Sequence, residues 1–516
     1  MSSIELSLFS SRIEAVCDEM GAVLRRSAFS PNIKDRLDFS CAVFDAGGQL
    51  CAQAAHIPVH LGSMAYAMRD IVGRLKWAEG DMVVVNDPFL GGTHLPDVTV
   101  IAPLFFGGAL LGFVANRAHH ADIGGNAPGS MPISRSLEEE GIVIPPSYLV
   151  RSGKLDEALL ARIIGSTGDH HALHGDFAAQ MSANRNGLAR LDELVRSLGA
   201  ERYTQALREL NRYAERLARA ALGEIPDGCY RFSDCLDDDG LGNVDLAIRA
   251  AVTVHGSDVY VDFAGSALQT AGNVNCPLSV AAAGVYYVFR CLMPVQTPAC
   301  AGSFRPITLA APRGSLLNAE RPAAVAAGNV ETSSRVVDVI CGALAQALPE
   351  RIPAASHGSM NNLAMGARGD AAGHGKWDYY ETMGGGMGAG AMGGGLSAVQ
   401  THMTNTLNTP VEVLEMNYPL RLRRYALRRG SGGKGKRCGG DGVIREFEFL
   451  APAEVTLLTE RRRHPPWGLA GGGEGGRGEN RFNGELLPGK VSVTVERGDC
   501  LTVATPGGGA WGESNG

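Results

Sequence analysis

The sequence predicts an α+β fold that is mixed and divided into several regions. Apolar residues recur at helical spacing near the N-terminus and over residues 154–223, whereas they alternate over residues 228–263 and 443–505. No sustained internal repeat occurs, which argues against a solenoid or a propeller. A chain of 516 residues with 45% hydrophobic and 20% charged residues is long enough to bury two or three cores.

We expect three regions along the chain. Residues 1–225 form an α/β region that contains a hairpin over 97–118 and a helical segment over 154–223. Residues 226–420 form a mixed α/β region that starts with β-structure and carries glycine-rich loops, and residues 421–516 form a β-rich C-terminal region.

The chain opens with an amphipathic helix over residues 5–25, for which Ser2 or Ser3 is available as the N-cap. Residues 39–44 and 49–52 flank the turn sequence Asp45–Gly48 and predict two strands. A helix follows near residues 61–75, and then come strands over 82–85, 98–106 and 109–115. Gly107 and Gly108 separate the last two strands, and a two-residue glycine turn is typical of a hairpin.

The helical segment is expected to break near Gly199. After the alternating stretch from Gly228 to Phe263, helices are predicted around residues 278–292 and 333–348.

Composition and charge exclude several classes of protein. The formal net charge is -7, and Lys and Arg are scattered, so no nucleic-acid footprint is visible. No stretch of 18 or more uncharged apolar residues predicts a membrane span, and Met1 to Phe9 lacks the features of a signal peptide, so we expect a cytoplasmic protein. The 11 cysteines include no CxxC pair and are interpreted as free thiols, mostly buried.

Glycine is the unusual residue, with 68 copies. They crowd into residues 384–395, 430–442, 471–478 and 507–509, where the backbone is expected to turn tightly or to approach a ligand or partner closely. The sequence does not decide whether these loops shape a pocket or an interface.

Two short segments carry a cluster of metal-ligand residue types. His94-Leu-Pro-Asp97 precedes the predicted hairpin, and His119-His120-Ala-Asp122 follows it. Imidazole and carboxylate together suit Zn, Mn or Fe. A turn at Gly107–Gly108 places Asp97 opposite Ala118 and His119 opposite Pro96, so both segments meet at the open end of one hairpin. The alternative is that these histidines only satisfy backbone groups at the strand ends.

Neighbouring residues of a strand point to opposite faces, so only one of His119 and His120 can face a given metal. We interpret His94, Asp97 and His119 as metal ligands. His120 is then expected to support a ligand or touch substrate, and Asp122 to be a ligand or to orient one. His120 and Asp122 are therefore the candidate catalytic residues, and residues 1–225 are the predicted metal-binding region.

Other motifs are weaker. His170 and His174 have helical i, i+4 spacing without the glutamate of HExxH, and a solvated helix face is the preferred interpretation. His56 and His60 flank Pro58 and either line a pocket or cap a loop. The stretch 430–436 fits G-x-x-x-x-G-K, but Arg437 replaces the required hydroxyl, so no nucleotide site is predicted.

Long motifs in this sequence closely resemble the hydantoinase B/oxoprolinase family. The strongest are Asn86-Asp-Pro-Phe-Leu-Gly-Gly-Thr-His-Leu-Pro-Asp97 and Arg117-Ala-His-His-Ala-Asp-Ile-Gly-Gly125. Others are His56-Ile-Pro-Val-His-Leu-Gly-Ser-Met64, Gly328-Asn-Val-Glu-Thr332 and Thr401-His-Met-Thr-Asn-Thr406. The likeness covers nearly the whole chain, and the family's metal motif falls on His94, Asp97 and His119.

The resemblance implies a B-type subunit in a hetero-oligomer with a larger, ATP-binding A-type subunit. In the family, the A-type part is thought to phosphorylate a carbonyl or enol oxygen, and the B-type part carries a divalent metal and completes the reaction. The expected reaction is ATP-dependent hydrolysis of a small cyclic amide, such as a hydantoin, 5-oxoproline or a related lactam. Two alternatives are a subunit of an acetone- or acetophenone-type carboxylase and a non-catalytic scaffold for the A-type subunit.

Overall fold

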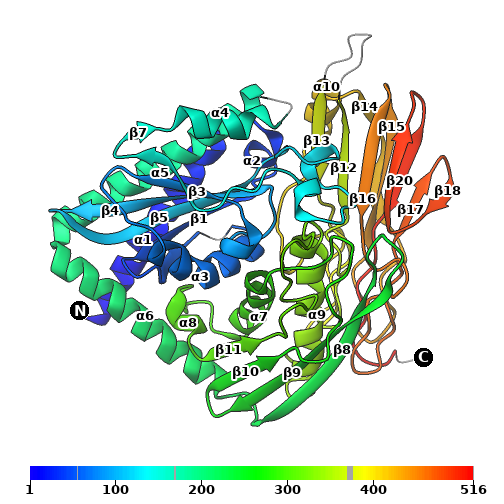
Figure 1. The fold of residues 1–516 in the computed structure, drawn as a ribbon. Coiled ribbons are helices and arrows are strands. Elements are labelled where there is room, and N and C mark those ends of the chain that lie inside the picture. The colour runs from blue at the N-terminus through cyan, green and yellow to red at the C-terminus, as the bar shows by residue number, and fades with distance from the viewer. Residues whose placement is uncertain (55, 168–169, 369–375, 515–516) are drawn as a thin grey trace.

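The computed structural model describes residues 1–54, 56–167, 170–368 and 376–514, and it shows a mixed α/β fold with four sheets (Figure 1). Among the described helices, none is long and apolar enough to cross a membrane.

The N-terminal part is built on a seven-stranded sheet with the order β2-β1-β5-β4-β3-β6-β7. Its strands are β1 (Phe39–Asp45), β2 (Leu50–Gln53), β3 (Met82–Val85), β4 (Asp97–Phe106), β5 (Ala109–His119), β6 (Ser147–Arg151) and β7 (Lys154–Leu155). The surrounding helices are α1 (Ser3–Ser27), α2 (Pro31–Lys34), α3 (Pro58–Gly73), α4 (Glu157–Gly165), α5 (His170–Leu198) and α6 (Ala200–Leu222).

Alternation along the strands places a different helix layer on each face of this sheet. Cys41 and Val43 of β1 belong to a core shared with α1 and α5, whereas Ala42 and Phe44 belong to a core shared with α3. Both faces are therefore covered by helices, and Asp97 at the start of β4 and His119 at the end of β5 are buried. The N-cap of α1 is Ser2, whose side chain accepts from the Glu5 N–H, and α5 and α6 break at Gly199 as predicted.

The middle of the chain forms a four-stranded sheet, β11-β10-β9-β8, against two helices (Figure 1). Its elements are β8 (Gly228–Asp238), β9 (Val244–His255), β10 (Asp258–Asp262), β11 (Ile307–Ala310), α7 (Leu278–Leu292), α8 (Ala301–Phe304) and α9 (Ser333–Leu344). Short helical turns elsewhere are η1 (Pro88–Leu90), η2 (Pro128–Ser130), η3 (Leu137–Glu140) and η4 (Gly328–Thr332).

The remaining two sheets have the orders β13-β12-β16-β19 and β14-β15-β20-β17-β18, and both contribute to one apolar core. Their strands are β12 (Asn362–Ala367), β13 (Trp377–Glu381), β14 (Leu420–Arg428), β15 (Gly442–Phe449), β16 (Ala453–Leu458), β17 (Glu479–Phe482), β18 (Glu485–Leu487), β19 (Lys490–Val495) and β20 (Cys500–Ala504). Helix α10 (Val411–Asn417) precedes β14.

The glycine-rich segments pack against one another, backbone to backbone. Gly433 N donates to Gly508 O, Gly508 N donates to Gly440 O, and Gly440 N donates to Met387 O. A Cβ added at Gly386 would lie 1.9 Å from Gly440 O, which no side chain can accept. Close approach is thus the reason for the glycines, and the neighbour is another glycine segment of this same chain.

Candidate metal centre

The hairpin of β4 and β5 sets the geometry of the site. Gly107 and Gly108 both have positive φ, 58° and 78°, as the predicted two-residue turn requires. The predicted register is wrong by one residue, because an irregularity after Leu104 adds an extra residue to β5. As a result His119 lies opposite Asp97 rather than opposite Pro96. The correction matters because directly opposite residues share one face of a sheet.

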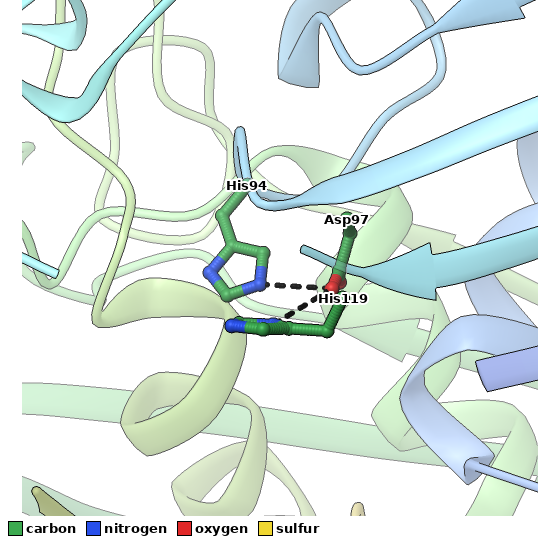
Figure 2. A group of neighbouring side chains, drawn as sticks. All are labelled: His94, Asp97 and His119. Atoms are coloured by element: carbon green, nitrogen blue, oxygen red, sulfur yellow. Dashed lines mark hydrogen bonds and ion pairs between the residues drawn. The ribbon is translucent and has the colours of Figure 1, made fainter. Parts of the chain in front are cut away.

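The structure brings His94, Asp97 and His119 together in one buried cluster (Figure 2). His94 Nε2 lies 3.1 Å from Asp97 Oδ1, and His119 Nδ1 lies 3.2 Å from the same oxygen. Asp97 begins β4, His119 ends β5, and His94 stands in the loop before β4.

The loop that carries His94 is shaped by its own motif. Asn86 Nδ2 donates to Leu95 O, and Asn86 Oδ1 accepts from Ile144 N, which fixes the loop to a neighbouring segment. Gly92 passes so close to the Asn86 carbonyl that a Cβ there would lie 2.2 Å from its oxygen. Asp97 N then donates to His94 O at 3.1 Å, and this turn holds the imidazole of His94 above the carboxylate.

The two oxygens of Asp97 have different surroundings. Oδ2 accepts from Thr93 Oγ1 at 2.7 Å and Asn329 Nδ2 at 3.0 Å, and it lies 3.1 Å from His60 Nε2. Oδ1 faces the two imidazoles of His94 and His119. Two donors and the His60 imidazole thus surround Oδ2, while Oδ1 faces the imidazole nitrogens of His94 and His119.

Burial and charge favour the ligand form of Asp97 and His119. Burial alone would raise the pKa of Asp97, but His60 and His94 hold that pKa well below its usual range, so the carboxylate is anionic. Burial lowers the pKa of His119 and favours its neutral ring. Burial opposes protonation of His94, but the neighbouring Asp97 outweighs burial and raises the pKa of His94 above its ordinary value. A metal that binds His94 must therefore displace a proton from this ring.

The donor set fits a divalent transition metal. His94 Nε2 and His119 Nε2 are buried and have no hydrogen-bond partner, although His94 Nε2 lies beside a carboxylate oxygen. Unsatisfied buried polar atoms are costly, and a bound cation would satisfy them. Two imidazoles with one carboxylate are a ligand set of Zn, Mn and Fe sites. The imidazole of His94 is also held from its other side, since its Nδ1 lies 3.1 Å from Ala326 O.

A family model described as "Hydantoinase B/oxoprolinase" matches residues 2–514 of this chain. The chain belongs to the hydantoinase B/oxoprolinase family. The resemblance that the motifs predict is therefore confirmed.

Two relatives place the chain within this family. The 5-oxoprolinase 1 of Arabidopsis thaliana is 39% identical over 99% of this chain, which spans 42% of that protein's length. The putative B-type subunit of a D-/L-hydantoinase from Pseudomonas sp. (strain NS671) is 32% identical over 97% of this chain and 88% of its own length. The chain thus matches a separate hydantoinase subunit nearly end to end but less than half of a 5-oxoprolinase.

Two solved structures share the fold. The ATP-dependent caprolactamase from Pseudomonas jessenii is 28% identical, with a TM-score of 0.92 over 99% of this chain and 91% of that chain. A nucleotide-free acetone carboxylase has a TM-score of 0.87 at 18% identity, over 99% of this chain and 76% of that chain, and at this identity the likeness shows the fold alone.

The two predicted catalytic residues of this hydantoinase B family member lie outside the cluster. His120 Nε2 lies 3.0 Å from Gln180 Oε1 of α5, and the His120 ring packs near Phe177, so it faces the helix layer rather than the cluster. Asp122 Oδ1 accepts from Gly124 N and Ser130 Oγ.

Asp122 also lines a cavity of about 580 Å³, whose wall includes Ala121 and Asp378. Burial, together with the negative charge of Asp122, raises the pKa of Asp378 to about 6. Two residues of the cavity lining, Ala121 and Asp122, thus follow His119 closely in the sequence, whereas His94, Asp97 and His119 themselves do not line the cavity.

Sequence reasoning missed three contributors to the site. His60, which it left open between a pocket and a loop cap, lies in α3 with its Nε2 beside Asp97. Asn329 belongs to the motif Gly328–Thr332, whose role was not assigned, and Tyr380 of β13 stacks on His119. The family motifs signalled the first two, whereas no sequence signal pointed to Tyr380.

The other histidine candidates lie elsewhere. His56 Nδ1 accepts from Cys41 N, and burial lowers the pKa of His56 to about 4, so it serves the packing of β1. His170 and His174 stand in the first turns of α5, where with the side chain of Leu160 they line a separate, mostly apolar cavity of about 750 Å³.

A second group of ligand-type residues lies at the surface. Cys235, Asp245 and His464 place one potential ligand atom each within 4.8 Å of the others. His464 Nε2 already pairs with Asp245 Oδ1 at 2.6 Å, and Arg463 lies 3.5 Å from the same oxygen. Asp245 Oδ1 thus already has two polar partners. Among the described residues, this group and the buried cluster are the two with metal-ligand geometry.

Proposed function

We propose that this chain is the B-type subunit of an ATP-dependent cyclic amidohydrolase and that it completes the opening of a lactam, hydantoin or 5-oxoproline ring. The observation that carries the proposal is the buried cluster of two imidazoles around an anionic carboxylate. The proposal includes an A-type, ATP-binding partner, a hetero-oligomer and a cytoplasmic location. It is supported by the 5-oxoprolinase and hydantoinase relatives and by the caprolactamase structure.

In this proposal His94, Asp97 and His119 hold a divalent metal, either Zn, Mn or Fe. When bound, such a metal lowers the pKa of a coordinated water toward about 7 and polarises an adjacent oxygen. An unstrained cyclic amide resists water, so activation by the partner's phosphorylation provides the leaving group that the second step needs.

The chain's own residues have separate tasks. Thr93 and Asn329 donate to Asp97 Oδ2 and keep its other oxygen directed at the imidazoles. His60 Nε2 lies 3.1 Å from the same Oδ2 and is a third polar neighbour of this buried oxygen. We assign the handling of the amine proton to Asp122, which faces the 580 Å³ cavity, whereas His120 is held by Gln180 and braces β5 against α5.

Co-expression with the ATP-binding partner tests the proposal. The purified complex is given ATP and a panel of cyclic amides and ketones, with and without bicarbonate. We expect ring-opened amino acid that requires ATP and does not require bicarbonate. Bicarbonate-dependent consumption of a ketone would replace the proposal with a carboxylase, and an unchanged rate for a complex with a disrupted cluster would support a scaffold.

A further inference from the structure

Tyr380 is the aromatic neighbour of the predicted ligand His119. The two rings are stacked, with centroids 4.5 Å apart and planes 12° from parallel. Tyr380 lies in β13, far from His119 in the sequence, and is buried. Arg36 donates to Tyr380 O at 2.8 Å, and its guanidinium lies 5.0 Å from the Tyr380 ring. The tyrosine is therefore fixed at its backbone as well as at its ring.

The hydroxyl of Tyr380 begins a chain of hydrogen bonds. It donates to Asn362 Oδ1 at 2.7 Å, and Asn362 Nδ2 donates to Glu331 Oε1 at 2.7 Å. Glu331 shares the turn η4 with Asn329, which donates to Asp97 Oδ2. The contacts thus close a ring around the cluster.

This ring joins three parts of the chain. The hairpin contributes the predicted ligands, η4 contributes Asn329 and Glu331, and the strands β12 and β13 contribute Asn362 and Tyr380. Every side chain in the ring is buried, so the groups that hydrogen-bond here rely on one another rather than on bulk water for partners. A stacked ring on one side of an imidazole restricts rotation about its χ2 torsion, because any rotation would collide with the tyrosine.

We propose that Tyr380 is a positioning residue for the metal ligand His119, held in turn by Asn362 and Glu331. The inference rests on the proposed metal centre. A residue that orients a ligand imidazole from outside the metal's own coordination typically changes metal affinity by roughly 10–100-fold when it is removed. Tyr380 acts through His119 and takes no part in bond making.

The test uses the full chain loaded with Co²⁺, whose visible absorption reports the geometry of its ligands. Tyr380→Leu removes the ring, Tyr380→Phe keeps the ring and removes the hydroxyl, and Tyr379→Leu is the matched control. Tyr379 is equally buried in the same strand but faces the other side, against Tyr418. Affinity is measured by competition with a chelator, and unfolding is followed alongside.

We expect Tyr380→Leu to weaken Co²⁺ binding by roughly 10–100-fold and to shift the absorption bands, with a smaller change in Tyr380→Phe. Tyr379→Leu should leave both unchanged, even where it lowers stability. Equal effects of Tyr380→Leu and Tyr379→Leu would overturn the positioning role and leave the metal centre standing. Failure of the wild-type chain to bind Co²⁺ at all would overturn the metal centre and this inference together.

Discussion

The buried cluster and the surface group contain similar ligand types in different settings. In the buried cluster, Asp97 Oδ2 is held by three polar neighbours, and His94 and His119 retain unpartnered ring nitrogens. In the surface group, Asp245 is half exposed and already pairs with His464 and Arg463. The first arrangement keeps two buried ring nitrogens without a hydrogen-bond partner, whereas the carboxylate oxygen of the second already has two polar partners.

The difference shows that proximity of ligand-type residues does not by itself make a metal centre. A bound cation offsets the free-energy cost of burying charged groups only where the ligand atoms are held in place and lack other partners. At the surface, water and Arg463 solvate Asp245 adequately, so a metal would gain little there. We therefore expect changes in or beside the buried cluster to alter turnover, pH dependence and metal content, and the matched changes at Asp245 and His464 to leave them unaltered.

The largest contrast is expected in turnover. Asp97→Asn keeps the size of the side chain and removes the anionic ligand, so ring-opened product from the complex should fall by roughly 100-fold or more. Phosphate release from ATP should continue in part, because phosphorylation is assigned to the partner. Asp245→Asn should change both rates by less than about twofold.

Both quantities are measured in one reaction of an assembled complex. A parallel fall of phosphate and product in Asp97→Asn would contradict the separation of the two steps. Normal product from Asp97→Asn would make Asp97 a structural residue.

A smaller contrast is expected in the pH dependence of stability. Burial, with a contribution from the neighbouring Glu460, raises the pKa of Glu331 to about 8. In the native state Glu331 therefore stays protonated over a pH range in which the same carboxyl group of the unfolded chain, with a pKa of about 4.3, is ionised. The contribution of Glu331 to the free energy of unfolding is fully present below the unfolded pKa. It is lost as pH rises toward about 8, at up to roughly 1.4 kcal/mol per pH unit.

Unfolding in urea at about pH 5, 6 and 7 measures this effect. Relative to Glu331→Gln, whose amide does not titrate, the wild type should lose stability with rising pH. Asp245, whose pKa is lowered chiefly by its hydrogen bond from His464, is already ionised in this range, so Asp245→Asn should show no such slope. A flat difference between wild type and Glu331→Gln would show that Glu331 is ionised in the native protein.

The open end of the β4–β5 hairpin shows how much of the site can be predicted from the sequence. Asp97 and His119 meet through strand pairing alone, and His94 joins them through the short turn that precedes β4. The one-residue error arose from an irregularity after Leu104, which no residue type signals. His60 and Asn329 reach Asp97 only through the packing of distant helices, and this packing depends on shape across the whole core.

Fold prediction shows the same division. Hydrophobic periodicity predicts the helices of the N-terminal half, and the alternation of apolar and polar residues predicts the strands β8 to β10. The glycine-rich segments have no periodicity, and their partners lie in other glycine segments far along the chain. Composition therefore predicts close approach there but not what is approached.

The smallest expected effect is an absence of activity. Residues 430–436 fit a phosphate-loop pattern, yet Lys436 N donates to Gly512 O and the loop lies among the glycine segments rather than between a strand and a helix. The chain alone should hydrolyse no ATP above background, and Lys436→Ala should leave that background unchanged. ATP turnover by the isolated chain that disappears in Lys436→Ala would show a nucleotide site in the chain itself.

The metal content of three purified proteins tests the central claim most directly. Elemental analysis of the wild type should find about one divalent transition metal per chain. His119→Ala should lose it, because one imidazole ligand is gone, whereas His464→Ala should keep it, because the surface group already satisfies its own charges. Retention of metal by His119→Ala, or its loss from His464→Ala, would contradict the assignment of the metal centre to the buried cluster.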